Sequence, residues 1–292
     1  MSRSQGVWDY KSIVPAKFTC FSTGNIRLDS VYCQASDGTS GFARGAISIL
    51  SGQKGLGKTR LSTTIMSSLL SRKLKVLYFE NEITPSQFCS HYKISIPSGL
   101  LFISDQNKLD LIYDTIMNIK PDMVFIDSLS KVEGFNSLSQ CALIFDKLRE
   151  AAESTNCHIA MIAHLNKEGV IKGASDTEHM ADITISMTKY IPSKKYLMYG
   201  NDVFDYRGVF IFKVTKNRFG KSDNYVAFKH RENGVVSFYS NVTDNWTLED
   251  AIHYLTIQDR NQVLPGKSDS CIMMIPRDGM WEKLARAFGI KT

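Results

Sequence analysis

The stretch GQKGLGKT, residues 52–59, decides the fold of this chain. It follows a short apolar run, AISIL at 46–50, and precedes LSTTIMSSLL at 61–70, which has helical character. Glycines let the backbone wrap around an anion with its N–H groups pointing inward, and a helix that follows presents its positive end to the same anion. The order of strand, glycine-rich loop and helix therefore predicts a phosphate-binding loop.

The spacing of this stretch is G-x-x-x-x-G-K-[ST], the pattern of a P-loop. In that pattern Lys58 brings a mobile positive charge to the β- and γ-phosphates, and the hydroxyl of Thr59 can ligate Mg²⁺. We therefore expect ATP and Mg²⁺ as cofactors. The residues predicted to line the nucleotide are Gly52, Gln53, Lys54, Gly55, Leu56, Gly57, Lys58, Thr59 and Arg60.

Short apolar runs alternate with helical segments on the C-terminal side of the loop. The strand-like runs lie at 75–81, 100–104, 122–127 and 158–163, and the helical segments at 58–72, 84–92, 108–119 and 139–155. This alternation predicts an α/β fold with a mainly parallel sheet and helices on both of its faces. After residue 181 the runs ITISMT, GVFIFKVT, NYVAFKH and GVVSFYS are joined by turns, and we expect antiparallel strands that extend the sheet edge.

The composition is that of a globular protein with a substantial core. The chain has 292 residues, of which 43% are hydrophobic, so one large domain is expected. The net charge of +6 is compatible with nucleic-acid binding without requiring it. The six cysteines lack C-x-x-C spacing, which predicts reduced thiols and no zinc. No apolar run has the length of a signal peptide or a membrane span, so we expect a cytoplasmic protein without membrane contact.

Carboxylates at two strand ends suit the hydrolysis of a nucleotide. Asp127 ends the run MVFID and is predicted to hold Mg²⁺, with the capping of Ser128 as the alternative. Glu82 follows the strand at 75–81, and Glu80 lies two residues earlier. A carboxylate at the end of this strand can face the γ-phosphate and orient the attacking water. The alternative for both glutamates is a solvent-facing position at the start of a helix.

A histidine follows the strand HIAMIA. His164 is predicted to lie beside the nucleotide, where its side chain can sense the γ-phosphate. A lone histidine is more often structural, so on chemistry alone the two roles stay open.

Four motifs, in order, resemble the ATPase core of the RadA/Sms family, which is related to RecA and to the DnaB-type replicative helicases. GFARGAISILSGQKGLGKTRL resembles the family's lead into its P-loop, and VLYFENEIT resembles YVSGEES of RadA and FFSLEMS of DnaB helicases. AHLNKEGVIKGASDTEHMADITISM resembles the RadA segment GHVTKEG…LEHMVD, and KNRFG at 216–220 is a RadA motif. The resemblance covers residues 20–240, implies a RecA-like P-loop fold, and places Glu82 rather than Glu80 on the catalytic glutamate.

The same resemblance gives a role to the KNRFG segment. It implies that Lys216 and Arg218 reach the nucleotide of a neighbouring subunit and stabilise charge on the transferred phosphoryl group. The working unit would then be a homo-oligomer, either a hexameric ring or a filament. The alternative for these cations is a basic strand end that faces solvent.

Two loops are expected to face DNA, as they do in relatives of RecA. They are SLSKVEGFNS at 128–137 and LNKEGVIKGASDTE at 165–178, with His179 helping to anchor the end of the second. Lys131, Lys167 and Lys172 are the predicted phosphate contacts on single-stranded DNA.

The expected organisation is a lead segment at 1–40, an ATPase core at 41–243 and a small helical tail at 244–292. Because RadA's zinc finger and Lon-like domain and the DnaB N-terminal domain have no counterpart, we expect a near-minimal core, of a kind that a bacteriophage could encode. The expected function is that of an ATP-dependent motor on single-stranded DNA, acting as a helicase or branch-migration ATPase with replication or recombination proteins. The alternative is a nucleotide-switched assembly protein or helicase-accessory ATPase that binds proteins instead of DNA.

Overall fold

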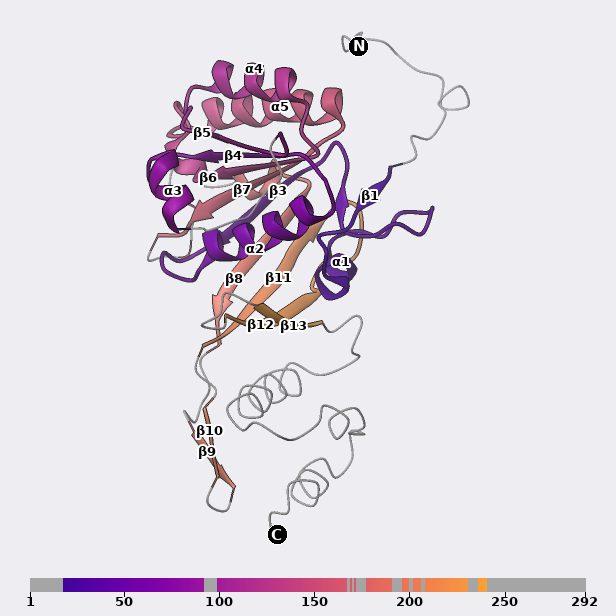
Figure 1. Ribbon diagram of the computed structural model, residues 1–292, viewed down its shortest axis with the longest axis vertical. Coiled ribbons are helices and arrows are strands. Elements are labelled where there is room, and N and C mark those ends of the chain that lie inside the picture. Colours follow the sequence, from indigo (N-terminus) through magenta and orange to yellow (C-terminus); the bar gives the residue numbers. More distant parts are fainter. Residues whose placement is uncertain are drawn as a thin grey trace.

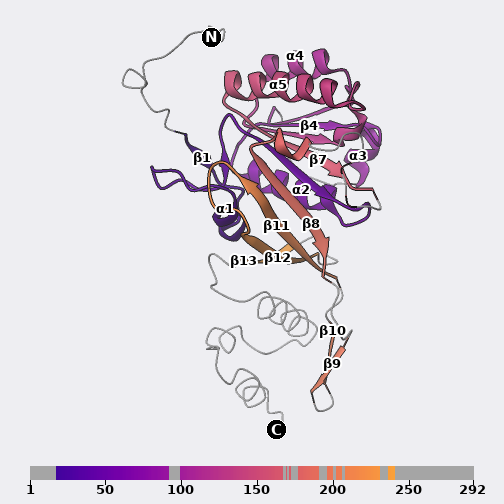
Figure 2. The same cartoon turned by 180° about the vertical axis from the view of Figure 1, so that it is seen from behind.

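The computed structural model describes residues 18–91, 99–166, 177–190 and 208–230, together with Gly169, Ile171 and the strand backbones at 196–199, 202–205 and 236–240. Over these residues one large sheet is covered by helices on both faces (Figures 1 and 2). No helix in this part of the chain is long and apolar enough to span a membrane. The helical tail predicted at 244–292 lies outside the described residues.

The strand that precedes the P-loop, β3 (Ile47–Gly52), lies inside the sheet. The described part of the sheet contains, in spatial order, β13 (Val236–Ser240), β12 (Tyr225–His230), β11 (Val209–Asn217), β8 (Ile183–Lys189), β3, β7 (His158–His164), β6 (Met123–Asp127), β4 (Val76–Glu80) and β5 (Leu101–Ser104). From β8 to β5 all neighbours are parallel, whereas β11, β12 and β13 are antiparallel to their neighbours. The predicted α/β RecA-like fold is confirmed.

One strand direction was predicted wrongly. The run ITISMT forms β8, which pairs in parallel with β3 and is antiparallel only to β11. A strand-like composition does not fix direction; direction depends on where the connection returns the chain. Here the connection after β7 carries the chain back to the edge of the sheet at which β3 begins, where Asp182 accepts a hydrogen bond from the amide of Ile47.

The helices divide into two layers. α1 (Ile26–Tyr32), α2 (Lys58–Ser71) and α3 (Pro85–His91) contribute to one hydrophobic cluster, and α4 (Leu109–Ile119) and α5 (Leu138–Thr155) contribute to the other. In both ribbon views α4 and α5 lie on the far side of the sheet from α1 and α2 (Figures 1 and 2). The smaller elements are the ladder of β1 (Cys20–Phe21) with β2 (Phe42–Ala43), the hairpin of β9 (Tyr196–Tyr199) with β10 (Asp202–Asp205), and the 3₁₀ turns η2 (Leu129–Lys131) and η3 (Thr177–His179).

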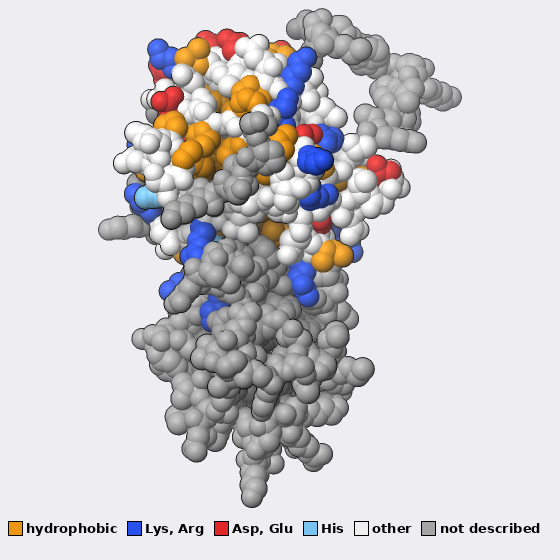
Figure 3. Space-filling view, in the orientation of Figure 1, with side chains coloured by type: hydrophobic (Ala, Val, Ile, Leu, Met, Phe, Trp, Pro, Cys, Tyr) orange, Lys and Arg blue, Asp and Glu red, His pale blue; other side chains and the backbone are white. Residues whose placement is uncertain are grey.

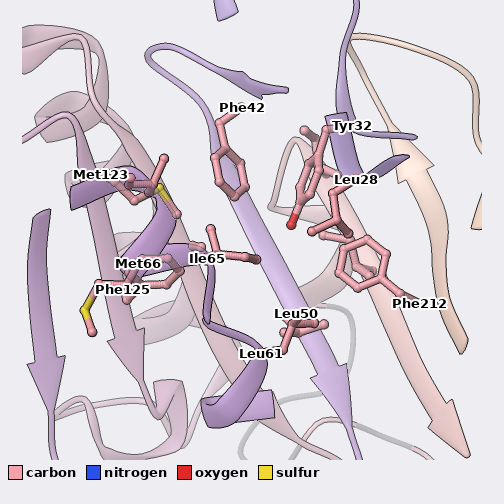
Figure 4. Packing of buried hydrophobic residues seen from close by; sticks show 14 of the residues in the cluster. Leu28, Tyr32, Phe42, Leu50, Leu61, Ile65, Met66, Met123, Phe125 and Phe212 are labelled. Carbon is pink, nitrogen blue, oxygen red and sulfur yellow. The ribbon is translucent and has the colours of Figure 1, made fainter. Parts of the chain in front are cut away.

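The first cluster joins the segment before the P-loop to the core. Figure 4 shows the ring of Tyr32, from α1, lying between Phe42 and Phe212. The centroid of the Tyr32 ring lies 4.6 Å from that of Phe42 and 5.6 Å from that of Phe212, which belongs to β11. Each buried ring of this kind contributes about 2 kcal/mol through the area it removes from water. Residues 20–35, within the predicted lead segment, therefore pack with the central sheet.

Burial falls off toward one edge of the sheet. Every residue of β3, β4 and β6 is buried, as expected for parallel strands covered on both faces, whereas β5 is only half-buried. Figure 3 shows hydrophobic side chains reaching the surface between α3 and α4 on the face in view. The core is therefore deepest around β3, which is where the P-loop begins.

A buried histidine links the start of β7 to the central strand. Nε2 of His158 lies 2.8 Å from Oγ of Ser48, and Nδ1 lies 2.8 Å from the carbonyl oxygen of Ala43. Complete burial lowers the pKa of this imidazole to about 4, although the hydrogen bond to Ala43 opposes that shift. His158 is therefore neutral in the folded protein at neutral pH.

This histidine makes stability depend on pH. The ordinary pKa of 6.5 is lowered in the fold, so between pH 6.5 and 4 the unfolded chain binds a proton that the folded chain does not. We expect acidification across this range to remove about 3 kcal/mol of unfolding free energy through His158. Urea unfolding at several pH values measures it, with His158→Gln as the comparison. Equal pH slopes for the two proteins would contradict this assignment.

Candidate nucleotide-binding site

The P-loop connects the carboxyl end of β3 to the first turn of α2. Gly55 and Gly57 both have φ of +84°, a left-handed backbone conformation that residues other than glycine rarely adopt. Gln53, Lys54 and Gly55 are exposed at the tip of the loop, and α2 begins at Lys58. The residues predicted to line the nucleotide therefore lie in one loop and helix start, with backbone geometry that needs the glycines.

The P-loop lysine is folded into its own loop. Nζ of Lys58 donates hydrogen bonds to the carbonyl oxygens of Gly52, at 2.7 Å, and Gln53, at 2.8 Å. Burial lowers the pKa of Lys58 to about 8, and the nearby carboxylates of Asp127 and Glu82 partly offset that effect. The loop thus encloses a cation whose charge suits phosphate oxygens.

Two hydroxyl groups meet one carboxylate beside this lysine. Oγ1 of Thr59 donates to Oδ2 of Asp127 at 2.7 Å, and the hydroxyl of Tyr78 donates to the same oxygen at 3.0 Å. Burial raises the pKa of Asp127, against the effect of these two hydrogen bonds. Mg²⁺ prefers hard oxygen ligands and is usually held by one or two protein groups with phosphates. The Thr59–Asp127 pair fits that ion.

The two candidate glutamates have different surroundings. The buried carboxylate of Glu80 accepts hydrogen bonds from the backbone N–H groups of Glu82, at 2.8 Å, and Ile83, at 3.1 Å, so it stabilises the turn after β4. The carboxylate of Glu82 is 37% exposed, and its Oε1 lies 3.1 Å from Nε2 of His164 and 3.5 Å from Oγ of Ser128. Of the two, Glu82 is the one whose carboxylate is accessible to a water molecule.

His164 lies at the carboxyl end of β7, between the P-loop strand and β6. Gly52 is its register partner on β3, and its imidazole contacts Glu82 as described above. It thus lies beside the strand that carries the P-loop and also contacts the glutamate that follows β4, two strands away from β7. The structure brings Lys58, Thr59, Glu82, Asp127 and His164 to one edge of the sheet.

The predicted DNA contacts are only partly described. Lys131 ends η2, directly after β6, and lines a hollow of about 400 Å³ with Glu82, Thr84 and Asn107. Lys167 and Lys172 lie outside the described residues. One of the three predicted lysines can therefore be located, and it lies beside the glutamate.

The KNRFG segment lies at the opposite end of the strands, where the parallel strands β3 and β8 begin. Asn217 pairs with Ile183, the first residue of β8, because β11 runs antiparallel to it. Nη1 of Arg218 donates to Oδ1 of Asp182 at 2.9 Å, and Oδ2 of Asp182 accepts from the amide of Ile47, the first residue of β3. Between Ile47 and Gly52 the strand rises roughly 16 Å. Lys216 and Arg218 are thus separated from the other predicted catalytic residues of their own chain.

One residue at the P-loop was not found from the sequence. A Cβ added to Gly57 would lie 2.7 Å from Nε2 of His230, which ends β12. His230 packs edge-on to Phe210 and Phe228, and burial lowers its pKa to about 4. No local pattern connects residues 57 and 230; the contact arises only because β12 folds back toward the loop.

Comparison with known proteins agrees with this geometry. A family model described as an AAA domain matches residues 38–170. DNA repair protein RadA of Chlamydia pneumoniae is 28% identical over 204 residues, which cover 67% of this chain and 42% of that protein. The RadA proteins of Listeria monocytogenes and Aquifex aeolicus are 27% identical over 203 residues and 26% identical over 202 residues. The chain spans about two fifths of the length of these relatives.

The inner strand of a mainly parallel sheet leads into a P-loop, and Asp127 meets Thr59 from a strand two places away. Together these features define a RecA-like P-loop ATPase fold. Within that class the chain is similar to the RadA proteins over about 200 residues, in agreement with the resemblance carried by the four motifs.

The contact between Gly57 and His230 can be tested with two matched glycines. Gly55 and Gly57 share φ of +84°, but a Cβ on Gly55 would meet nothing within 4 Å. We expect alanine at either position to lose about 1 kcal/mol of unfolding free energy through backbone strain. Gly57→Ala should lose a further 1 to 3 kcal/mol, roughly, through overpacking against His230. Chemical denaturation without nucleotide measures both.

Combining Gly57→Ala with His230→Ala should remove the further loss, because the new methyl group would then have room. If Gly55→Ala and Gly57→Ala are equally unstable, His230 does not pack against the loop in solution.

Proposed function

We propose that this chain is a Mg²⁺-dependent ATPase that works as an oligomer on single-stranded DNA, each nucleotide site being completed by a neighbouring subunit. The observation that carries the proposal is the separation of Arg218 from its own P-loop across the length of β3. Within one chain the two halves of the hydrolytic site lie at opposite ends of the strands. They can therefore come together only between two copies of the chain.

One subunit would supply the nucleotide-binding half. Lys58, now hydrogen-bonded to two loop carbonyls, would turn its charge toward the β- and γ-phosphates. Thr59 and Asp127 would hold Mg²⁺, which neutralises charge on the phosphate oxygens when it is bound. Glu82 would orient the attacking water and accept its proton, while the 3.1 Å contact with His164 fixes the carboxylate.

The neighbouring subunit would supply the positive charge. The side chain of Arg218 is 53% exposed, so it can approach a phosphate on another molecule. Lys216 is more constrained, since its Nζ donates to the carbonyl oxygens of His179 and Ala181, each at 2.7 Å. Of the two cations, Arg218 is therefore the better candidate for contact with the transferred phosphoryl group, and Lys216 would act mainly by supporting the strand end. Whether the oligomer is a hexameric ring or a filament follows from the angle between neighbours.

The DNA part of the proposal is supported by the relatives and by charge. The matched relatives are DNA repair proteins, and the chain carries a net charge of +6. Lys131 follows the strand that ends at Asp127, so DNA held there would lie close to the hydrolytic residues. Sequence-independent binding to phosphates would let hydrolysis drive movement along the strand, in helicase or branch-migration work with replication or recombination proteins in a bacterial or phage-infected cell.

Mixing two inactive variants tests the shared site. Arg218→Ala should bind ATP with unchanged affinity but lose at least tenfold in turnover, and Glu82→Gln should behave likewise. In a random mixture of the two, roughly one quarter of the interfaces join an intact Glu82 to an intact Arg218, so partial activity should return. Steady-state phosphate release measures it. Normal turnover by Arg218→Ala alone would refute the shared site.

DNA dependence separates the proposed motor from a protein-binding switch. We expect single-stranded DNA to stimulate phosphate release at least tenfold. Lys131→Ala should weaken DNA binding and lower the slope of log affinity against log salt concentration by about the amount expected for one phosphate contact. Lys73→Ala, at an exposed position just after the C-terminal end of α2, is a control for the loss of one positive charge elsewhere. Absence of stimulation together with absence of salt-sensitive binding would favour a nucleotide-switched assembly or accessory ATPase.

A further inference from the structure

The residue that fixes Arg218 in place is Asp182, which no motif pattern above assigned to a role. Its side chain is 4% exposed and lies just before β8, between α5 and the strand end that carries Arg218. Oδ1 accepts from Nη1 of Arg149 at 2.7 Å and from Nη1 of Arg218 at 2.9 Å. Oδ2 accepts from Nη1 of Arg149 at 2.8 Å and from the amide of Ile47 at 2.9 Å.

These contacts tie Asp182 rigidly to the sheet. The amide of Ile47 begins β3, so one carboxylate oxygen is fixed to the inner strand. Arg149, whose side chain is 17% exposed, is itself held by the carbonyl oxygen of Met180 at 2.7 Å. A buried carboxylate needs compensating charge, and Arg149 already supplies one positive charge. The second cation, Arg218, is therefore not needed for neutralisation, and its ion pair calls for another explanation.

Arg218 differs from Arg149 in its exposure. About half of its side chain is exposed, although its backbone N–H also donates to the carbonyl oxygen of Asp182 at 3.0 Å. The ladder between β11 and β8 shifts register between Val214 and Lys216, an irregularity that redirects the side chains after it. The guanidinium is thus anchored through one nitrogen at the protein surface, rather than enclosed like that of Arg149.

The rest of the KNRFG segment is also anchored. The side-chain amide of Asn217 donates to the carbonyl oxygen of Tyr32, and its oxygen accepts from the amide of Phe219 at 2.9 Å. Phe219 packs edge-on against Phe18, with ring centroids 5.4 Å apart. With the backbone fixed on both sides of residue 218, the remaining freedom is that of the Arg218 side chain itself, which is what Asp182 restricts.

We propose that Asp182 is a positioning residue that aims Arg218 of its own subunit at the nucleotide held by the neighbouring subunit. The inference rests on the proposed role of Arg218 in a shared site. A guanidinium held by one nitrogen keeps its other N–H groups for a phosphate, and a cation that is already oriented does not have to be ordered as charge develops. Asp182 itself touches no nucleotide.

The decisive variant is Asp182→Asn, which preserves shape and an acceptor for Ile47 but removes the charge that holds Arg218. We expect kcat for ATP hydrolysis to fall at least tenfold, with KM changed less than twofold, because the nucleotide is bound by residues of the other subunit. Adding Asp182→Asn to Arg218→Ala should cause no further fall. Asp122→Asn is the matched control, since Asp122 likewise accepts from an arginine, Arg44, and from a backbone amide, that of Lys75. Its kcat should stay within twofold of wild type.

Mixed oligomers distinguish positioning from a general loss of structure. Asp182→Asn subunits retain Glu82, so mixing them with Glu82→Gln subunits should restore activity as well as Arg218→Ala subunits do. Mixing Asp182→Asn with Arg218→Ala should restore nothing, because neither variant supplies an aimed arginine. Failure of the first mixture, or success of the second, would overturn the proposal.

The outcomes also separate this inference from the function on which it rests. If Arg218→Ala loses turnover while Asp182→Asn does not, the shared site stands and the positioning role is wrong. If Arg218→Ala is itself fully active, the shared site fails first. Should Asp182→Asn not give a cooperative thermal transition, Asp182→Glu becomes the decisive variant, because it keeps the charge and displaces the guanidinium. Wild-type kcat in Asp182→Glu would then overturn the proposal.

Discussion

The burial of β3 in the parallel part of the sheet is the constraint on which the site depends. Every residue of this strand is buried, with β7 on one side and β8 on the other. Its carboxyl end at Gly52 leads into the P-loop, and the amide of Ile47 at its amino end fixes Asp182. Because a β-strand is nearly inextensible, these two ends stay apart, and so do the phosphate-binding loop and Arg218. The proposed sharing of the site between subunits rests on that distance.

The carboxyl edge of the sheet concentrates buried charge. Burial lowers the pKa of Lys58 and raises those of Asp127 and Glu80, so desolvation is the leading influence on each of the three groups. Lys58 is held by loop carbonyls, and Asp127 by two hydroxyl groups. Burying these charged groups costs free energy. A bound metal–nucleotide complex, which carries both signs of charge, would reduce that cost. The same burial that stabilises the fold thus prepares this edge for a charged ligand.

The amino edge shows a different use of charge. Asp182 and Arg149 form a buried pair, and Arg218 joins it from the surface. The segment that supplies Asp182 also supplies the two carbonyl oxygens that hold Lys216. It directly follows the 165–178 loop, which the sequence predicts to face DNA.

The sequence alone determined the mainly parallel α/β fold and the P-loop, because alternating apolar runs and the GxxxxGKT spacing are local patterns. It also identified Asp127, Glu82 and His164 as candidates, since parallel strands end at a common edge. It did not reveal the direction of β8, the contact of His230 with Gly57, or the pairing of Asp182 with Arg149 and Arg218. Those features join residues 33 to 173 positions apart, and only the tertiary structure decides which distant side chains meet, because strand order and register depend on packing across the whole sheet.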